Sequence, residues 1–252
     1  MIIKLKTAVL VTLVFVLSQS SYVLATIIPS FNNFNTAGSY EDWTKTGVAT
    51  KETTIVHGGT GEAVNVRAKG GYPSYVYKDF ASDPGSYTQM QLSFWMYEYS
   101  ANANDQSLNI ALQDTTTVGY VGPNLRIKVK NGVRSLVHYY NIDNPANPGT
   151  ALLVEDVIAS IVMDQWSQLT ISASTISDTF TVQYNGVMYN NNGNGYSFYQ
   201  PINEISRVQF SNTNGSAVVS RTTIDDVSII VPEPCTIAIL ALGALAFRKK
   251  KA

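Results

Sequence analysis

Alternating side chains between Met90 and Tyr99 give one expected strand two different faces. Apolar residues occupy the face that we expect to pack in the core: Met90, Leu92, Phe94 and Met96. Aromatic and polar residues share the other face: Gln91, Ser93, Trp95, Tyr97 and Tyr99. Aromatic planes stack on the C–H faces of sugars, while polar neighbours bond their hydroxyls. Trp95, Tyr97 and Tyr99 are therefore candidate sugar-binding residues. The alternative is that they pack under a long loop such as Asn141–Thr150.

Histidine and carboxylate patterns give little basis for catalysis. The chain has two histidines, His57 and His138, which are too few for a histidine-metal site, and no nucleophile-elbow motif surrounds a serine. Three acid pairs are adjacent in sequence: Glu155-Asp156, Asp225-Asp226 and Glu41-Asp42. Neighbours on a strand point to opposite faces, so these pairs do not suit a paired-carboxylate glycosidase. We expect no enzymatic activity. A lyase stays open, in which His138 would act with one of several tyrosines: Tyr97, Tyr139 or Tyr140.

Two Asn-Gly pairs predict tight hairpins, because Asn and Gly tolerate the positive φ of type I′ turns. Asn131-Gly132 separates two strand-like segments, and Asn185-Gly186 separates two more. In the first hairpin, pairing Lys130 with Val133 places His138 opposite Leu125. His138 is then expected to be a hydrogen-bonded histidine at the core edge. The basic residues on the other face are expected to form a solvated row: Arg126, Lys128 and Lys130.

Elsewhere, short segments rich in Val, Ile, Thr, Tyr and Phe alternate with Gly, Asn, Asp and Pro clusters, and no sustained helical period appears. The sequence therefore predicts an all-β fold made of two antiparallel sheets. We expect one domain over residues 26–230, between an N-terminal signal helix and a short C-terminal hydrophobic helix.

Both ends of the chain carry targeting patterns. Lys4 and Lys6 precede an apolar segment, and a small-residue motif ends at Ala25, which predicts a signal peptide over residues 1–25 cleaved after Ala25. Residues 231–252 contain a Pro-Glu-Pro turn, an apolar run from Cys235 to Phe247 and a basic end. A helix over that run spans about 20 Å, short of the roughly 30 Å core of a bilayer. The positions that define this tail are Pro232, Glu233, Pro234, Arg248, Lys249, Lys250 and Lys251.

This tail resembles the PEP-CTERM protein-sorting signal over the whole of residues 231–252. The resemblance implies recognition by an exosortase, a membrane-embedded transpeptidase-like enzyme, and cleavage near Pro-Glu-Pro. The protein would be held in the membrane briefly by the C-terminal helix and then moved to the cell surface or extracellular matrix. A plain C-terminal membrane anchor is the alternative.

The middle of the chain resembles the laminin G-like and concanavalin A-like jelly-roll sandwiches. The resemblance rests on the order of several weak motifs: Leu92-Ser93-Phe94-Trp95, Trp166-x-x-Leu169-x-Ile171, a strand ending at Asn185-Gly186, and Ile224-Asp225-Asp226-Val227. It implies two sheets with one concave face. It also implies a structural Ca²⁺ where the first and last strands meet, with oxygen ligands from Glu41, Asp42, Asp225 and Asp226. Turn capping by Asp225 or Asp226 is the alternative to this calcium site.

Charge and cysteine content narrow the partners. The chain has 17 basic and 18 acidic residues, and its two ends hold six of the basic ones and one of the acidic ones. Residues 26–231 therefore carry 11 basic and 17 acidic residues, a net charge of −6, which does not favour nucleic-acid binding. The single cysteine, Cys235, excludes an intrachain disulfide. We expect an exported, non-enzymatic sandwich with an extracellular polysaccharide as ligand. The alternatives are a purely structural surface protein and a carbohydrate-active hydrolase or lyase.

Overall fold

The structure is a computed structural model, and it describes residues 25–27, 43–59, 61–69, 71–80, 87–102, 105–116, 120–143, 150–213 and 220–232. The described residues form strands and two short 3₁₀ turns, η2 (His57–Gly59) and η3 (Asn191–Gly193), and include no α-helix. No helix in this part of the chain is long and apolar enough to cross a membrane. The predicted signal helix and C-terminal hydrophobic helix lie outside the described residues.

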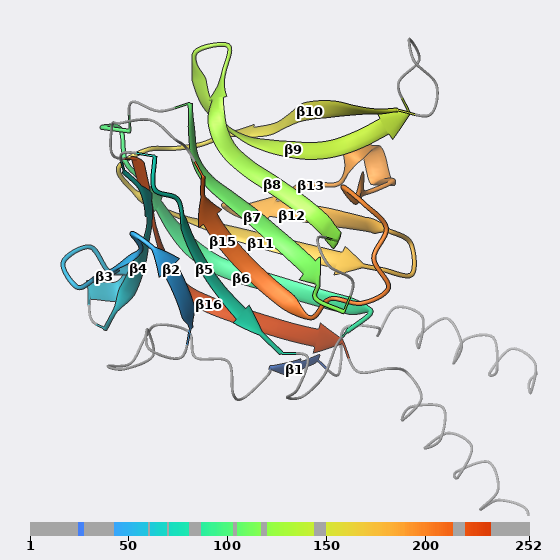
Figure 1. The fold of residues 1–252 in the computed structure, drawn as a ribbon, viewed down its shortest axis with the longest axis horizontal. Helices are drawn as coiled ribbons and strands as arrows, with labels where there is room; N and C mark the ends of the chain where they lie inside the picture. The colour runs from blue at the N-terminus through green and yellow to red at the C-terminus, as the bar shows by residue number, and fades with distance from the viewer. Residues whose placement is uncertain are drawn as a thin grey trace, which may run out of the picture. The chain divides into compact units, whose positions relative to one another are not determined.

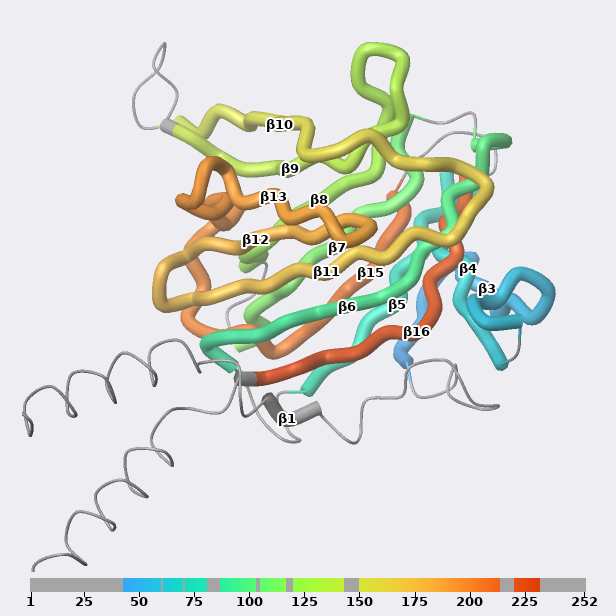
Figure 2. The backbone as a smooth tube through the Cα atoms, turned by 180° about the vertical axis from the view of Figure 1, so that it is seen from behind, coloured from blue at the N-terminus to red at the C-terminus, as the bar shows by residue number. Residues whose placement is uncertain are grey.

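Two antiparallel sheets form the sandwich, which confirms the predicted fold class. Sheet A has the order β13 (Val187–Tyr189), β12 (Thr179–Tyr184), β11 (Trp166–Ser174), β6 (Gln89–Glu98), β16 (Ser220–Pro232), β4 (Ala63–Ala68) and β3 (Thr50–Glu52), with β14 (Tyr196–Ser197) beside β12 and β1 (Ala25–Ile27) beside β16. Sheet B has the order β10 (Ala151–Ser160), β9 (Val133–Asp143), β8 (Tyr120–Lys130), β7 (Gln106–Asp114), β15 (Arg207–Asn212), β5 (Ser74–Asp79) and β2 (Thr44–Gly47). Sheet B faces the viewer in Figure 1, and sheet A faces the viewer in Figure 2.

The chain divides into two compact units. One unit spans residues 28–229 and contains the sandwich. The other consists of residues 1–27 and 230–252. In the second unit, β1 pairs with the last residues of β16, so that Ala25 lies opposite Pro232 and Thr26 opposite Val231. The predicted signal-cleavage residue and the first residue of the Pro-Glu-Pro turn therefore share one short ladder.

The predicted hairpin register is confirmed. Lys130 pairs with Val133, and Leu125 pairs with His138. Asn131 and Gly132 have φ values of 51° and 79°, as a type I′ turn requires. The second hairpin has the same geometry, since Asn185 and Gly186 have φ values of 47° and 83°.

Alternation along β6 directs its apolar side chains into the core, as predicted. Phe94 is fully buried and packs edge-on against Phe210 of β15, with ring centroids 4.9 Å apart. The ring centroids of Trp43 and Phe210 are 5.9 Å apart. Aromatic contacts between the two sheets thus fill the centre of the sandwich.

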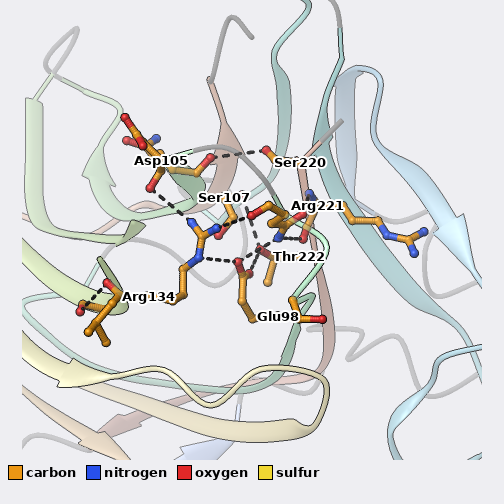
Figure 3. A network of polar contacts seen from close by, with 12 residues as sticks. Glu98, Asp105, Ser107, Arg134, Ser220, Arg221 and Thr222 are labelled. Carbon is orange, nitrogen blue, oxygen red and sulfur yellow. Dashed lines mark hydrogen bonds and ion pairs between the residues drawn. The ribbon is translucent and has the colours of Figure 1, made fainter. Parts of the chain in front are cut away.

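A buried ion pair lies in the same interior, at the end of β6 (Figure 3). Glu98 and Arg134 are 1% and 6% exposed, and Arg134 Nε lies 3.4 Å from Glu98 Oε1. Asn102 Nδ2 donates to Glu98 Oε1, and Thr222 Oγ1 donates to Glu98 Oε2. Arg134 donates to the carbonyl oxygens of Asn102 and Asp105. The network joins strands of both sheets, and a buried charge pair of this kind is tolerated because its remaining groups are hydrogen-bonded.

Candidate functional site

Trp95 and Tyr97 lie on the outer face of sheet A, half-buried, as the alternation of β6 requires. Tyr97 pairs across the sheet with Trp166 of β11, and their ring centroids are 5.6 Å apart. Tyr99 differs from the other two predicted sugar-facing residues. It is 6% exposed, and its hydroxyl lies 2.8 Å from Thr223 Oγ1. Tyr99 is therefore a buried, hydrogen-bonded residue and offers little ring surface to a ligand.

His57 covers part of the aromatic group. Its ring stacks on Trp95, with centroids 4.0 Å apart and planes 15° apart, and meets Trp166 edge-on. Among the described residues, the covering segment is therefore η2; most of Asn141–Thr150, the segment considered from the sequence, lies outside them. Farther along the same face the polar side chains bond one another: Ser93 with Thr170, and Gln91 with Ser172.

Asp225 and Asp226 hold the covering segment in place. Asp225 Oδ2 accepts from the backbone N–H of His57 at 2.8 Å, and Asp226 Oδ2 contacts His57 Nδ1. The expectation that these adjacent carboxylates point to opposite faces is wrong for this pair. Asp226 has a φ of 50°, which breaks the alternation of the strand and turns both carboxylates toward His57.

The calcium site remains a prediction. Asp225 accepts two backbone N–H groups, from His57 and Asp226, as in the capping alternative. Glu41 and Asp42, the other two predicted ligands, lie outside the described residues. Within the described residues, no group of three or more His, Cys, Asp or Glu side chains could hold a metal ion.

The burial of Asp225 predicts how the stability of the fold depends on pH. Desolvation raises the pKa of this carboxyl from 3.8 to about 6, against the lowering effect of the His57 and Asp226 N–H groups. The folded state therefore holds the proton more tightly than the unfolded state, and the stabilisation from this group is lost as pH rises from about 4 to about 6. A shift of this size corresponds to about 3 kcal/mol.

We expect the free energy of unfolding of Asp225→Asn, measured with urea at pH 4 and pH 7, to fall less over this range than that of the wild type. Asp105→Asn, a change at an exposed acid before β7, should keep the wild-type pH dependence. Parallel profiles for the wild type and Asp225→Asn would contradict the assignment.

His138 lies on the inner face of sheet B, as the hairpin register predicts. It is 2% exposed, and its Nε2 lies 2.8 Å from the carbonyl oxygen of Ser197. Burial lowers the pKa of the imidazole. Its ring stacks on Tyr140, whose hydroxyl donates to Asp156 Oδ2. Tyr139 and His138 are neighbours on a strand and face opposite sides, so they do not form the acid–base pair considered from the sequence.

The outer face of sheet B carries a second group of aromatic and polar residues, which sequence reasoning took for a solvated basic row. Arg126 Cζ lies 3.4 Å from the centroid of the Tyr139 ring. The Tyr139 and Tyr199 rings are stacked at 5.7 Å, with planes 7° apart. The backbone N–H of Tyr199 donates to the carbonyl of Gly122 in β8, which fixes Tyr199 beside this face.

Two asparagines complete this group. Asn109 of β7 pairs across the sheet with Arg126, and Asn124 precedes Arg126 by two residues on the same face of β8. Asn124 is 6% exposed, and its Oδ1 has no hydrogen-bond partner among the described residues. Asn109 Oδ1 and Arg126 Nε are likewise buried without a partner in this part of the chain. We call this set the Arg126 cluster: Asn109, Asn124, Arg126, Tyr139 and Tyr199.

The two faces therefore differ in their capacity for a ligand. A buried polar group without a partner costs roughly 1–3 kcal/mol, so such groups are rare in folded proteins unless a ligand or water completes them. Three of them lie together in the Arg126 cluster, beside two stacked rings. Sheet A holds two such atoms among the described residues, Arg67 Nε in β4 and Asp226 Oδ1 in β16. On its outer face, His57 covers Trp95 and the neighbouring hydroxyls bond one another.

Comparison with known proteins identifies the fold only. No protein-family model matches the chain, and no curated protein sequence matches it. Among solved structures, the chain is similar to a carbohydrate esterase, vb_24B_21, of the Shiga toxin-encoding bacteriophage phi24B, with a TM-score of 0.55 and 16% identity over 83% of this chain and 100% of that one. It is also similar to an endo-β-1,4-glucuronan lyase of the fungus Trichoderma reesei, with a TM-score of 0.52 and 14% identity over 79% of this chain and 94% of that one.

A sialidase gives a TM-score of 0.56 at 12% identity, over 79% of this chain. The chain spans 18% of the length of that sialidase. These likenesses place the sandwich among folds found in carbohydrate-active proteins. At 12–16% identity they transfer no activity to this chain.

Proposed function

We propose that this protein is an exported cell-surface or matrix protein whose sandwich binds an extracellular polysaccharide through the outer face of sheet B. The observation that carries the proposal is the unfilled hydrogen-bonding capacity of the Arg126 cluster beside the stacked rings of Tyr139 and Tyr199. Sugars offer both apolar C–H faces and hydroxyl donors, which suit this combination. The occurrence of similar folds in a carbohydrate esterase and a glucuronan lyase supports the same class of ligand.

Export is supported by the sequence of the two ends. The signal-peptide pattern ending at Ala25 would bring the chain across the membrane. The Pro-Glu-Pro turn, apolar run and basic end would then present it to an exosortase-type enzyme, with the C-terminal helix as a transient anchor. The partners of the protein under this proposal are that enzyme, the membrane before processing, and a polysaccharide.

Binding to a panel of soluble neutral and acidic polysaccharides, measured by affinity electrophoresis, tests the ligand and the face together. Tyr139→Ala removes the ring between Arg126 and Tyr199, and we expect it to weaken binding about tenfold, which corresponds to about 1.4 kcal/mol. The matched control is Trp95→Ala on sheet A, which should leave binding unchanged. The opposite result would assign binding to the Trp95 face.

The other two functions make different predictions in the same assay. A purely structural surface protein would bind no polysaccharide of the panel. A hydrolase or lyase would generate reducing or unsaturated ends when incubated with one of the polymers, and such ends would overturn the non-catalytic part of the proposal.

A further inference from the structure

Arg126 differs from the other cations on the outer face of sheet B. Lys128 and Lys130 both bind Glu155 of β10, with Lys128 Nζ 2.7 Å from Glu155 Oε1. Arg207 pairs with Asp79, with Nη2 2.9 Å from Oδ2. Each of these cations thus has a carboxylate beside it.

The Arg126 guanidinium has none among the described residues. Its contacts there are the Tyr139 ring and, from Nη1, the Gln106 amide oxygen at 3.5 Å, a long hydrogen bond. Its Nε is buried and has no hydrogen-bond partner within the described ranges. A guanidinium carries five N–H donors in a fixed planar fork, so most of the donor capacity of Arg126 is unused.

The local charge favours an anion. Among the described residues, the three cations of β8 on this face, Arg126, Lys128 and Lys130, form ion pairs with one carboxylate, Glu155. The three positive charges and one negative charge leave a local excess of two positive charges. Residues 26–231 as a whole carry a net charge of −6. A positive patch on an acidic domain attracts anionic ligands over neutral ones.

We infer that the Arg126 cluster recognises the carboxylate of a uronic acid residue, so that the polysaccharide ligand is anionic. This inference rests on the proposed function. A uronate carries a carboxylate that matches the planar fork of Arg126, a C–H face for Tyr139 and Tyr199, and hydroxyls that donate to the free oxygens of Asn109 and Asn124. These three chemical features coincide in one sugar unit.

The test compares each polyuronate with its own carboxyl-reduced form, which has the same linkages and sugar stereochemistry and carries an uncharged hydroxymethyl group in place of each carboxylate. Polygalacturonate, alginate and polyglucuronate are suitable polymers. We expect the wild-type protein to bind at least one of them at least tenfold more tightly than the reduced form, as measured by isothermal titration calorimetry. Arg126→Gln should bind the native and reduced forms of that polymer equally.

Three controls make the result specific. Arg126→Lys keeps the charge without the planar fork and should retain only part of the preference. Lys128→Gln should retain most of it, because Lys128 already binds Glu155. Thermal unfolding of each variant at the wild-type temperature shows that the fold is intact.

Equal binding of native and reduced polymers by the wild-type protein, or an unchanged preference in Arg126→Gln, would overturn the inference. Tighter binding to a sulfated polymer than to all three polyuronates would overturn the assignment to a carboxylate. Binding to neutral polymers alone would leave the proposed function standing, whereas binding to no polymer of either class would overturn the proposed function as well.

Discussion

Replacing Arg134 with Met is expected to lower the free energy of unfolding by about 3–5 kcal/mol, the usual cost of leaving one partner of a buried ion pair alone. Arg134 is 6% exposed, and the carboxylate it faces, Glu98, is 1% exposed. Burial raises the pKa of Glu98, against the opposing effects of Thr222, Ser107, Asn102 and Arg134. Without Arg134, two backbone carbonyls also lose a donor, those of Asn102 and Asp105.

Urea unfolding of the purified protein at pH 7 measures this effect. The matched control is Asp79→Asn, which removes an ion pair between a 45% exposed Asp79 side chain and a 25% exposed Arg207 side chain, and should cost no more than about 1 kcal/mol. Glu98→Leu combined with Arg134→Met should cost less than the sum of the two single changes, because neither charge is then left unpaired. A loss below 1 kcal/mol for Arg134→Met would show that the pair contributes little to stability.

Replacing Pro232, Glu233 and Pro234 with alanine is expected to abolish C-terminal processing almost completely. The Pro-Glu-Pro segment is the part of the tail that a plain membrane anchor does not need, and the sequence predicts an extended backbone for a carboxylate flanked by two prolines. Immunoblotting of membrane and surface fractions, with mass spectrometry of the C-terminus, would show an uncleaved, membrane-retained species.

The control for this prediction is Ser228→Ala, a change in the same strand, β16, that precedes the tail. It should be processed like the wild type. Normal release of the triple-alanine variant would contradict recognition by an exosortase-type enzyme and favour a different route to the surface.

The hairpins show why part of the fold could be predicted. The register of β8 and β9 follows from two residues, Asn131 and Gly132, whose conformational preferences are local. Once that turn is fixed, the period of two decides which face each side chain takes, and His138 must point inward. The core face of β6 follows from the same rule.

The candidate site could not be predicted in this way. Tyr199 reaches Tyr139 from a segment about sixty residues later in the chain, and no sequence pattern relates the two. His57 covers Trp95 because Asp225 and Asp226, far along the chain, hold its segment. The one signal that sequence reasoning had for the Arg126 cluster was the basic row of β8, which is indistinguishable from a solvated strand face until its carboxylate partners are known.

By itself, then, the sequence determined the all-β class, the hairpin registers and the apolar face of β6, because each depends on neighbouring residues. The targeting role of the two ends stays a prediction from the sequence. The tertiary structure alone decided that, among the described residues, Arg126 has no carboxylate partner and lies close to the unpaired oxygens of Asn109 and Asn124. Those properties depend on contacts between strands distant in sequence, and hydrogen-bond satisfaction of a side chain is defined only when all of its neighbours are in place.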